Sequence, residues 1–328
     1  MKRYWLTAIA VCMACSDSVG PAPEVTRSTT PNAPQAHFVT VAPGVRLEVL
    51  DYGGTGAPLV LLAGSGNTAH VFAAFAWRFT DRFHVIAITR RGFGYSSQPA
   101  DGYDTRTLSE DLRTVLDSLR LSQVNLVGHS LAGDEMTRFA GDHPDRVRRL
   151  VYLDAAYDRV ALRSIVQQFP FPPPPMPTTR ELSSPEGFSN YVRRVRGVAL
   201  PAEEIAATYR FAPDGTFQGE VTPPEVYAAL LAGEEAPDYA RVKANSLGIY
   251  AVATNATGVV PWIAPTRPVW PVAQEVFHRV YEPFYLGQRI RFDTEVARST
   301  RLDFEGQNHY LFLSAPESVA SAVRAFLR

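Results

Sequence analysis

The most informative stretch of the sequence for the fold is Val124-Asn125-Leu126-Val127-Gly128-His129-Ser130-Leu131-Ala132-Gly133. Its first four residues form a short, mostly apolar run, which is typical of a strand buried on both faces of a parallel sheet. Apolar residues at helical spacing follow over residues 132–140. The small residues Gly128 and Ala132 allow a sharp turn between strand and helix, which would push the Ser130 hydroxyl out at the edge of the sheet. The stretch therefore predicts a strand, a tight turn that presents Ser130, and a helix.

The rest of the chain repeats this alternation of strands and helices. An apolar-polar alternation around Pro43-Gly44 predicts an antiparallel hairpin over residues 38–50. Apolar runs predict strands at residues 58–63, 83–88, 124–127, 150–153 and 247–254, and a last strand is expected over 300–304. Helical spacing predicts helices over 108–119, 132–140 and 319–327, and Thr107 with Glu110 predicts a capping box at the first of them. This alternation predicts an α/β fold with a mostly parallel sheet flanked by helices.

Residues 159–245 break the rhythm. Phe169-Pro170-Phe171 is followed by four more prolines, and short helical patterns appear at 188–195 and 226–231. A structureless loop of this length is rare in a compact domain. We therefore expect a cap over 159–245, inserted into a core made of 37–158 and 246–328. Phe169 and Phe171 are candidates for an apolar pocket wall above Ser130, although an extended polyproline segment would explain them too.

The composition is that of an ordinary globular protein. The 328 residues are 46% hydrophobic and 20% charged, with a net charge of -1. Nucleic-acid binders usually carry a basic excess, so no nucleic-acid partner is expected. The two cysteines, Cys12 and Cys15, both lie near the start of the chain. The body of the protein therefore has no cysteine for a disulfide or for a zinc site of the cysteine type.

The first residues have the pattern of a bacterial export signal. Lys2 and Arg3 precede an apolar stretch over residues 4–14, which is too short to span a bilayer. Val11-Cys12-Met13-Ala14-Cys15 resembles a lipobox, with Cys12 where Leu or Val is usual. We expect a signal peptide over 1–15, a flexible linker over 16–36 and export to the periplasm, the outer membrane or the medium. Lipidation of Cys15 would attach the protein to a membrane, whereas an ordinary signal peptide would release it.

Three motifs together resemble the α/β-hydrolase superfamily, in particular its serine-nucleophile members with a cap. They are the Ser130 turn, Arg91-Gly92-Phe93-Gly94-Tyr95-Ser96 after an earlier strand, and Gly306-Gln307-Asn308-His309 near the end. Their order and spacing match over about residues 40 to 328. The resemblance implies an eight-stranded, mostly parallel sheet with a helical cap between the sixth and seventh strands. It does not fix the substrate, because one fold carries many activities.

His309 is the expected catalytic base among the seven histidines. It follows the strand predicted at 300–304, where the resemblance places the catalytic histidine. The resemblance also implies an oxyanion hole from the backbone N–H groups of Leu131 and Ser65. His70 and His129 are candidates for lining the pocket, although His129 is poorly placed to reach back to its neighbour's hydroxyl.

The acid that would orient His309 is not in its most common place. In many members of the superfamily it follows the seventh strand, but residues 255–261 contain no carboxylate. Asp154 directly follows the sixth predicted strand, and some members carry their acid there. We therefore predict Asp154 as the acid, with Asp158 as the second candidate. Asp154 could otherwise be a buried residue that only bonds loop N–H groups.

These residues predict a serine hydrolase that cleaves a carboxylic ester or amide through an acyl-enzyme on Ser130, without a metal or organic cofactor. Ser130 argues against haloalkane dehalogenases and epoxide hydrolases, which use an aspartate at the nucleophile position. A prolyl-type aminopeptidase remains an alternative. It would need carboxylates in the cap to hold an amine, and the candidates are Glu203, Glu204, Glu234 and Glu235. The other alternative is a non-catalytic ligand-binding protein on a hydrolase scaffold.

Overall fold

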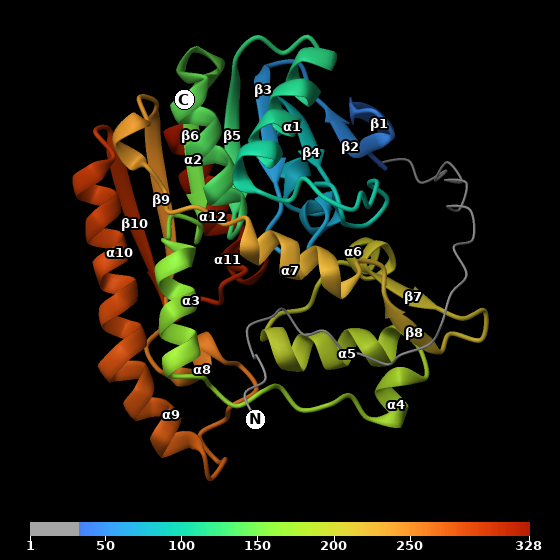
Figure 1. The fold of residues 1–328 in the computed structure, drawn as a ribbon, viewed down its shortest axis with the longest axis vertical. Coiled ribbons are helices and arrows are strands. Elements are labelled where there is room, and N and C mark those ends of the chain that lie inside the picture. Colours follow the sequence, from blue (N-terminus) through green and yellow to red (C-terminus); the bar gives the residue numbers. More distant parts are fainter. Residues whose placement is uncertain (1–32) are drawn as a thin grey trace.

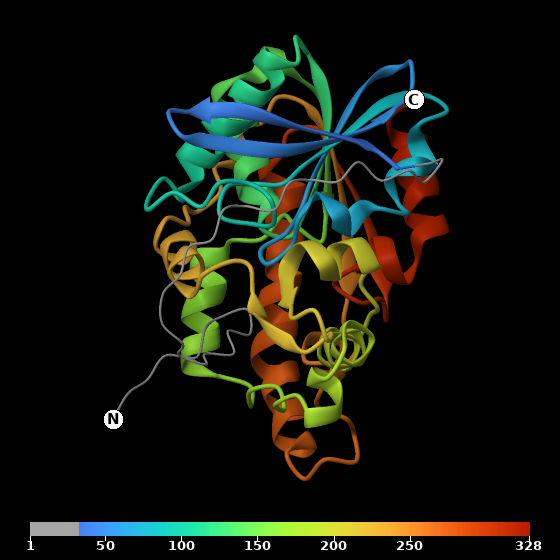
Figure 2. The same cartoon turned by 90° about the vertical axis from the view of Figure 1, so that its right-hand side faces the viewer.

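An eight-stranded sheet runs through the molecule, with helices on both of its faces (Figures 1 and 2). The structure is a computed structural model that describes residues 33–328. The strand order is β1-β2-β4-β3-β5-β6-β9-β10. The strands are β1 (Gln35–Ala42), β2 (Val45–Gly53), β3 (Ala57–Leu62), β4 (Phe83–Ile88), β5 (Val124–His129), β6 (Val147–Leu153), β9 (Asn245–Val252) and β10 (Ser299–Glu305). The pairs β1–β2 and β2–β4 are antiparallel and the other neighbours are parallel, so the predicted α/β fold is confirmed.

The strands formed by the apolar runs lie in the middle of this sheet, where helices cover both faces and keep their side chains from water. Every residue of β5 is buried, as are the last four residues of β3 and of β6. The helices and 3₁₀ turns of one face are η1 (Ala69–Phe72), η2 (Ala76–Phe79), α11 (Leu311–Ser314) and α12 (Pro316–Phe326). Those of the other face include α1 (Thr105–Ser118), α2 (Ala132–Asp142) and α10 (Glu282–Glu295). The short turns η3 (Pro144–Arg146) and η4 (Tyr239–Arg241) complete the connections.

The first long helix begins earlier than its sequence pattern predicted. α1 starts at Thr105, and the Asp104 side chain accepts a hydrogen bond from the Thr107 N–H. Asp104 is thus the N-cap, and Thr107 is already inside the helix. The predicted Thr107–Glu110 capping box was wrong because a better capping residue stands one turn upstream.

The segment between β6 and β9 folds into short helices and a two-stranded ribbon. Its elements are α3 (Arg159–Gln168), α4 (Thr179–Leu182), α5 (Pro185–Arg196), α6 (Ala202–Thr208), β7 (Tyr209–Phe211), β8 (Phe217–Glu220) and α7 (Pro224–Ala232). They lie beyond the carboxyl ends of the parallel strands (Figure 1). The sequence pattern did not predict the ribbon, whose Phe217 ring stacks on Phe188 of α5 with centroids 4.1 Å apart.

A second excursion leaves the sheet between β9 and β10, and the sequence analysis did not predict it. It contains α8 (Ala256–Val259), α9 (Trp270–Val276), the π-helix η5 (Phe277–Tyr281) and the long α10. α9 runs through η5 into α10, and this helical rod extends well past the end of the sheet (Figure 1). Its aromatic side chains form a small core of their own around Phe277 and Tyr281.

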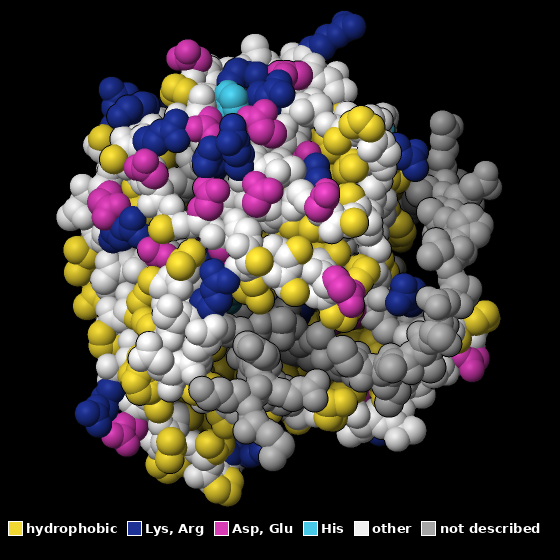
Figure 3. Space-filling view, in the orientation of Figure 1, with side chains coloured by type: hydrophobic (Ala, Val, Ile, Leu, Met, Phe, Trp, Pro, Cys, Tyr) yellow, Lys and Arg dark blue, Asp and Glu magenta, His cyan; other side chains and the backbone are white. Residues whose placement is uncertain are grey.

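The surface over α1 and α2 carries basic and acidic side chains side by side (Figure 3). Many of them pair, as Arg113 does with Asp117 at 2.8 Å and Arg146 with Asp117 at 2.7 Å. Within residues 33–328, no helix is long and apolar enough to cross a membrane. The predicted signal peptide and lipobox lie outside the described residues. Strand β1 begins at Gln35, so the last two residues of the predicted linker belong to the sheet.

Candidate active site

Ser130 lies at the turn between β5 and α2. Its φ of 54° is in the left-handed region, which non-glycine residues seldom adopt and which often marks a functional turn. Small neighbours make this turn possible, since a Cβ added to Gly128 would lie 3.0 Å from the Ala132 Cβ. Only 7% of Ser130 is exposed, and it lines a cavity of about 250 Å³ at the carboxyl edge of the sheet. Strand, turn and helix therefore present Ser130 as the sequence predicted.

His309 and Asp154 meet in the same cavity, although 155 residues separate them along the chain. His309 lies in the loop between β10 and α11, and Asp154 directly follows β6. The His309 Nδ1 is 2.6 Å from the Asp154 Oδ2. The other carboxylate oxygen, Oδ1, accepts hydrogen bonds from the Tyr157 hydroxyl and, at 3.1 Å, from the Ala251 N–H. These bonds fix the carboxylate, which in turn holds the imidazole ring.

Asp158, the second candidate for the acid, lies elsewhere. It is the N-cap of α3, where Oδ1 accepts a hydrogen bond of 2.9 Å from the Ala161 N–H. Its other oxygen, Oδ2, pairs with Arg291 of α10 at 3.1 Å. Both Asp158 oxygens thus bind groups that hold α3 in place. The carboxylate that faces His309 is that of Asp154.

The Ser130 hydroxyl faces an arginine rather than His309. The Arg159 Nη2 donates to the Ser130 Oγ at 2.9 Å, and no hydrogen bond joins Ser130 to His309, both of which lie in the described part of the chain. Catalytic hydrogen bonds are often long or misaligned in free enzymes and tighten when substrate binds. The sequence analysis missed Arg159. The sequence feature that could have pointed to Arg159 is a cation at the start of the first cap helix, five residues after Asp154.

Two backbone N–H groups beside Ser130 are free to hold an oxyanion. Ser65 follows β3 and Leu131 precedes α2, and both line a second, larger cavity of about 380 Å³. Neither N–H donates to any residue within 33–328. The loop packs closely on the turn, since a Cβ on Gly64 would lie 2.9 Å from the Ser130 Cβ. The amino end of α2 adds its partial positive charge at the same point.

A buried carboxylate from the cap holds the loop after Ser65. Glu204 of α6 accepts hydrogen bonds from the Asn67 Nδ2 at 2.8 Å and from the Thr68 N–H at 3.1 Å. Asn67 in turn accepts a 3.0 Å hydrogen bond from the Tyr310 hydroxyl, next to His309. Burial raises the pKa of Glu204, while the hydrogen bonds from Thr68 and Asn67 oppose that rise. One network therefore connects the cap, the oxyanion loop and the histidine loop.

The four residues predicted to line the pocket have different outcomes. Phe171 lines the larger cavity. Phe169 is 42% exposed and is not part of either cavity wall near Ser130. His70 bonds Glu48 through Nε2 at 3.0 Å, away from both cavities. His129 is fully buried under the His309 loop, and burial lowers its pKa well below the usual value. Those three residues therefore do not line the cavities as expected.

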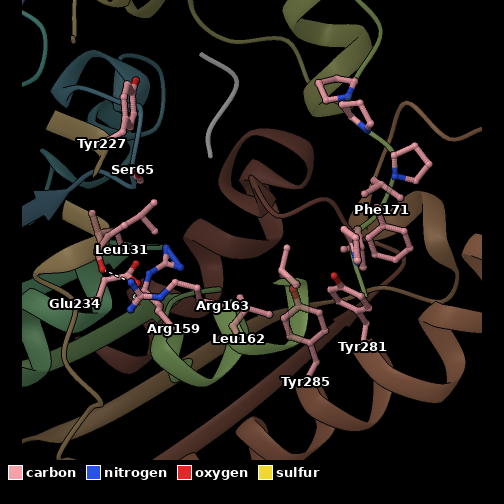
Figure 4. A pocket seen from close by; sticks show the side chains of 18 of the residues that line it. Ser65, Leu131, Arg159, Leu162, Arg163, Phe171, Tyr227, Glu234, Tyr281 and Tyr285 are labelled. Atoms are coloured by element: carbon pink, nitrogen blue, oxygen red, sulfur yellow. Dashed lines mark hydrogen bonds and ion pairs between the residues drawn. The ribbon is translucent and has the colours of Figure 1, made fainter. Parts of the chain in front are cut away.

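Much of the cavity wall comes from the second excursion, which the sequence analysis assigned to the core. Val259, Trp262, Tyr281 and Tyr285 line the larger cavity, and the Trp262 Nε1 donates to the Pro172 carbonyl at 2.9 Å. Figure 4 shows Tyr281 and Tyr285 pointing toward the side chains of α3. The sequence could have predicted this excursion, because the stretch between β9 and β10 is too long and too rich in aromatic residues for a single connecting helix.

Substituting Gly64 with alanine should lower kcat by about 10² to 10³, the scale for losing one oxyanion donor. The new Cβ would lie 2.9 Å from both the Ser130 Cβ and the His129 Nδ1, so the loop or the turn must shift. The measurement is kcat on an activated ester. Gly287→Ala is the control, because a Cβ there meets nothing within 4 Å. Equal kcat for both variants would show that the loop does not hold the oxyanion.

Comparisons with known proteins find hydrolases similar to this chain. The family model described as the alpha/beta hydrolase fold matches residues 57–204. 2-Hydroxymuconate semialdehyde hydrolase from Pseudomonas sp. (strain CF600) is 37% identical over 131 residues, which are 38% of this chain and 45% of that protein. Soluble epoxide hydrolase from Corynebacterium sp. (strain C12) is 34% identical over 118 residues, which are 36% of this chain and 41% of that protein. The chain thus matches less than half the length of these curated relatives.

The likeness to solved structures covers more of the chain. The crystal structure of E-2-(acetamidomethylene)succinate hydrolase superposes with a TM-score of 0.65 and 20% identity, covering 89% of this chain and 98% of that one. At this identity the likeness concerns the fold. Together, the sheet order, the family-model match over residues 57–204 and the superposition show that the chain has the α/β-hydrolase fold.

Proposed function

We propose that the protein is a serine hydrolase that cleaves carboxylic esters through an acyl-enzyme formed on Ser130. One observation carries this proposal: Ser130, at its strained turn, shares a cavity with the His309–Asp154 pair, whose Nδ1–Oδ2 distance is 2.6 Å. The free N–H groups of Ser65 and Leu131 stand at the same edge. Nucleophile, base, orienting acid and oxyanion donors are the four parts that acyl transfer needs.

The mechanism follows from these positions. Asp154 keeps the imidazole proton on the His309 Nδ1, which leaves Nε2 free to accept a proton. As Nε2 takes the Ser130 proton, Oγ attacks the ester carbonyl, and the N–H groups of Ser65 and Leu131 hold the oxyanion. His309 then gives that proton to the leaving alcohol. A water molecule, deprotonated by His309, attacks the acyl-enzyme carbonyl. The acyl–Oγ bond then breaks, His309 returns the proton to the Ser130 Oγ, and the acid is released.

The relatives do not settle which bond is cleaved, because their names cover several. One is named for a semialdehyde, one for epoxides and one for an acetamido-substituted succinate. The epoxide hydrolases resembling this chain use an aspartate as nucleophile, and here Ser130 stands at that position. A serine nucleophile with a histidine base favours an ester or an amide over an epoxide.

The carboxylates required by a prolyl-type aminopeptidase are mostly engaged elsewhere. Glu204 is buried and bonds Asn67 and Thr68. Glu234 pairs with Arg163 at 3.2 Å, and Glu235 with Arg138 at 2.9 Å. Only Glu203 of the four has no such partner among the described residues. This distribution favours ester cleavage over removal of an N-terminal residue.

A fluorophosphonate probe and a substrate panel test this function. We expect the probe to label Ser130, and 4-nitrophenyl esters to be hydrolysed faster than aminoacyl anilides. Peptide mapping of the labelled protein identifies the modified serine. Labelling at another serine would contradict the mechanism. Faster anilide cleavage would favour the aminopeptidase, and no turnover with no labelling would favour a binding protein.

We also propose that the protein is exported and anchored through a lipid on Cys15, as its first residues suggest. One diacylglycerol-type anchor on the mature N-terminus would place the enzyme on a membrane face outside the cytoplasm. Mass spectrometry of the purified membrane fraction is expected to find an N-terminal lipid-modified cysteine. A mature chain that starts beyond residue 15 without a lipid would rule out the anchor and leave export in place.

A further inference from the structure

The Arg159 guanidinium lies where the two cavities of the active site meet. Arg159 is the first residue of α3, and its side chain is 16% exposed. It lines both the cavity that contains Ser130 and the larger apolar cavity. Its Nη2 donates to the Ser130 Oγ at 2.9 Å. Figure 4 shows the guanidinium beside Leu131, at the polar end of the larger cavity.

No carboxylate among the described residues is hydrogen-bonded to the Arg159 guanidinium, although those of Asp134 and Glu234 lie near it. Asp134 is 3.6 Å from the Arg159 Nε, and neither the Nε nor the facing Asp134 Oδ2 has a hydrogen-bond partner among the described residues. Asp134 is buried in α2, where burial raises its pKa well above the usual value and the nearby Arg159 charge opposes that rise. A partly buried cation without a hydrogen-bonded anion is well placed to bind an anionic group of a ligand.

The neighbouring arginine shows the contrast. Arg163 lies one turn further along α3 and faces the same larger cavity. It pairs with Glu234 at 3.2 Å and also donates to the Leu231 carbonyl. Arg163 therefore has protein partners for its charge, whereas the one hydrogen bond that the Arg159 side chain makes to a described residue goes to the nucleophile itself. A serine hydroxyl is a neutral acceptor, and a carboxylate would be a stronger one.

We propose that Arg159 binds a carboxylate of the substrate, so that the enzyme prefers esters carrying an anionic group close to the scissile carbonyl. This rests on the proposed function, because the distance is set by attack from Ser130. A carbonyl carbon in position for attack lies about 3–3.5 Å from the nucleophile. A carboxylate bound to a guanidinium lies about 2.8 Å from its nitrogens. The Arg159 Nη2 is only 2.9 Å from the Ser130 Oγ. In the substrate, about two to four bonds therefore separate the scissile carbonyl carbon from the carboxylate carbon.

Binding of the carboxylate also frees the nucleophile. When the guanidinium turns toward the anion, the Ser130 hydroxyl loses its Arg159 partner and can donate to His309. The anionic group thereby raises kcat as well as affinity, since it assembles the serine–histidine hydrogen bond that the free protein lacks. A neutral ester of equal length cannot draw Arg159 away from Ser130.

A matched pair of substrates tests this preference. Monomethyl succinate and methyl butyrate have the same number of chain carbons and differ in the terminal carboxylate. We expect kcat/KM for monomethyl succinate to exceed that for methyl butyrate, measured by titration of the released acid. Arg159→Met, which keeps length and removes charge, should reduce this ratio by about 10- to 100-fold, the scale of a charge-assisted hydrogen bond. Arg159→Lys should keep part of the preference, because lysine retains the charge but lacks the planar guanidinium that can donate two hydrogen bonds to one carboxylate.

Arg163→Met is the control, since it removes an arginine from the same helix and cavity whose charge the protein already pairs. We expect it to change the ratio by less than about threefold. Equal ratios in wild type and Arg159→Met, or a wild-type preference for methyl butyrate, would overturn the inference while leaving ester hydrolysis intact. Equal losses in the Arg159 and Arg163 variants would also overturn it, because any cation in the cavity would then serve.

A binding measurement separates the inference from the proposed function. Succinate titrated into Ser130→Ala by calorimetry should bind at least 10-fold more tightly than to Ser130→Ala with Arg159→Met. This comparison needs no turnover. If no ester is cleaved but succinate binding depends on Arg159, the catalytic proposal fails and the carboxylate site stands. If both proteins bind succinate equally, the carboxylate site fails whatever the esters show.

Discussion

Replacing Ser130 with alanine should lower kcat for any cleaved ester by about 10⁶, the scale for removing the serine of a catalytic triad. The variant lacks the atom that forms the acyl bond, so His309 and the oxyanion donors can only assist attack by water. The residual rate should be independent of fluorophosphonate treatment. The measurement is single-turnover and steady-state kinetics on one ester, with circular dichroism to confirm folding.

Ser164→Ala is a suitable control for this variant. Ser164 is an exposed residue of α3 whose hydroxyl bonds only the Val160 carbonyl, and it lines neither cavity. We expect its kcat to equal that of the wild type. A folded Ser130→Ala protein that keeps more than about 1% of wild-type kcat would mean that another group is the nucleophile.

Local sequence patterns were sufficient to predict the fold. Buried parallel strands read as continuous apolar runs, and the eight predicted strands correspond to those of the sheet. The Ser130 turn was predictable for the same reason, because strand, small residues and helix are contiguous in the chain. Asp154 and His309 were predicted from the resemblance to the superfamily. The structure brings them together because parallel strands end at one edge of the sheet.

The parts that the sequence did not predict depend on contacts between distant segments. Glu204 could be read as an exposed helix residue or as an amine ligand, and only the packing of α6 against the loop after β3 shows that it holds Asn67 and Thr68. The cavity wall from Tyr281 and Tyr285 depends on where the helical rod of α9 and α10 lies. Arg159 is locally only a cation at the start of a helix, and its significance comes from the distance to Ser130.

Asp154→Asn should lower kcat by about 10⁴, the scale seen when the aspartate of a catalytic triad is neutralised. The Asp154 Oδ2 faces the His309 Nδ1 at 2.6 Å, which keeps the imidazole proton on that nitrogen. An asparagine amide in that place can donate an N–H to Nδ1, which moves the ring proton to Nε2. His309 would then have no lone pair directed at Ser130, and the imidazolium formed during attack would lose its counter-charge.

Asp158→Asn is the matched control, because the same chemical change falls four residues away. Asp158 caps α3 through Ala161 and pairs with Arg291. Asparagine caps helices about as well as aspartate does, so the helix that carries Arg159 should stay in place. We expect kcat within a few-fold of wild type and a small loss of stability from the Arg291 pair. Both variants would be compared by kcat on one ester and by thermal unfolding.

The asparagine at position 154 should fold, because its carbonyl oxygen can still accept the hydrogen bonds that Asp154 takes from Tyr157 and Ala251. The φ of 47° at this position also suits asparagine, which tolerates the left-handed region better than most residues. A loss of activity would therefore report on the imidazole and not on the sheet. Near-wild-type turnover by folded Asp154→Asn would mean that the 2.6 Å contact with His309 is structural, and that a different group orients the base.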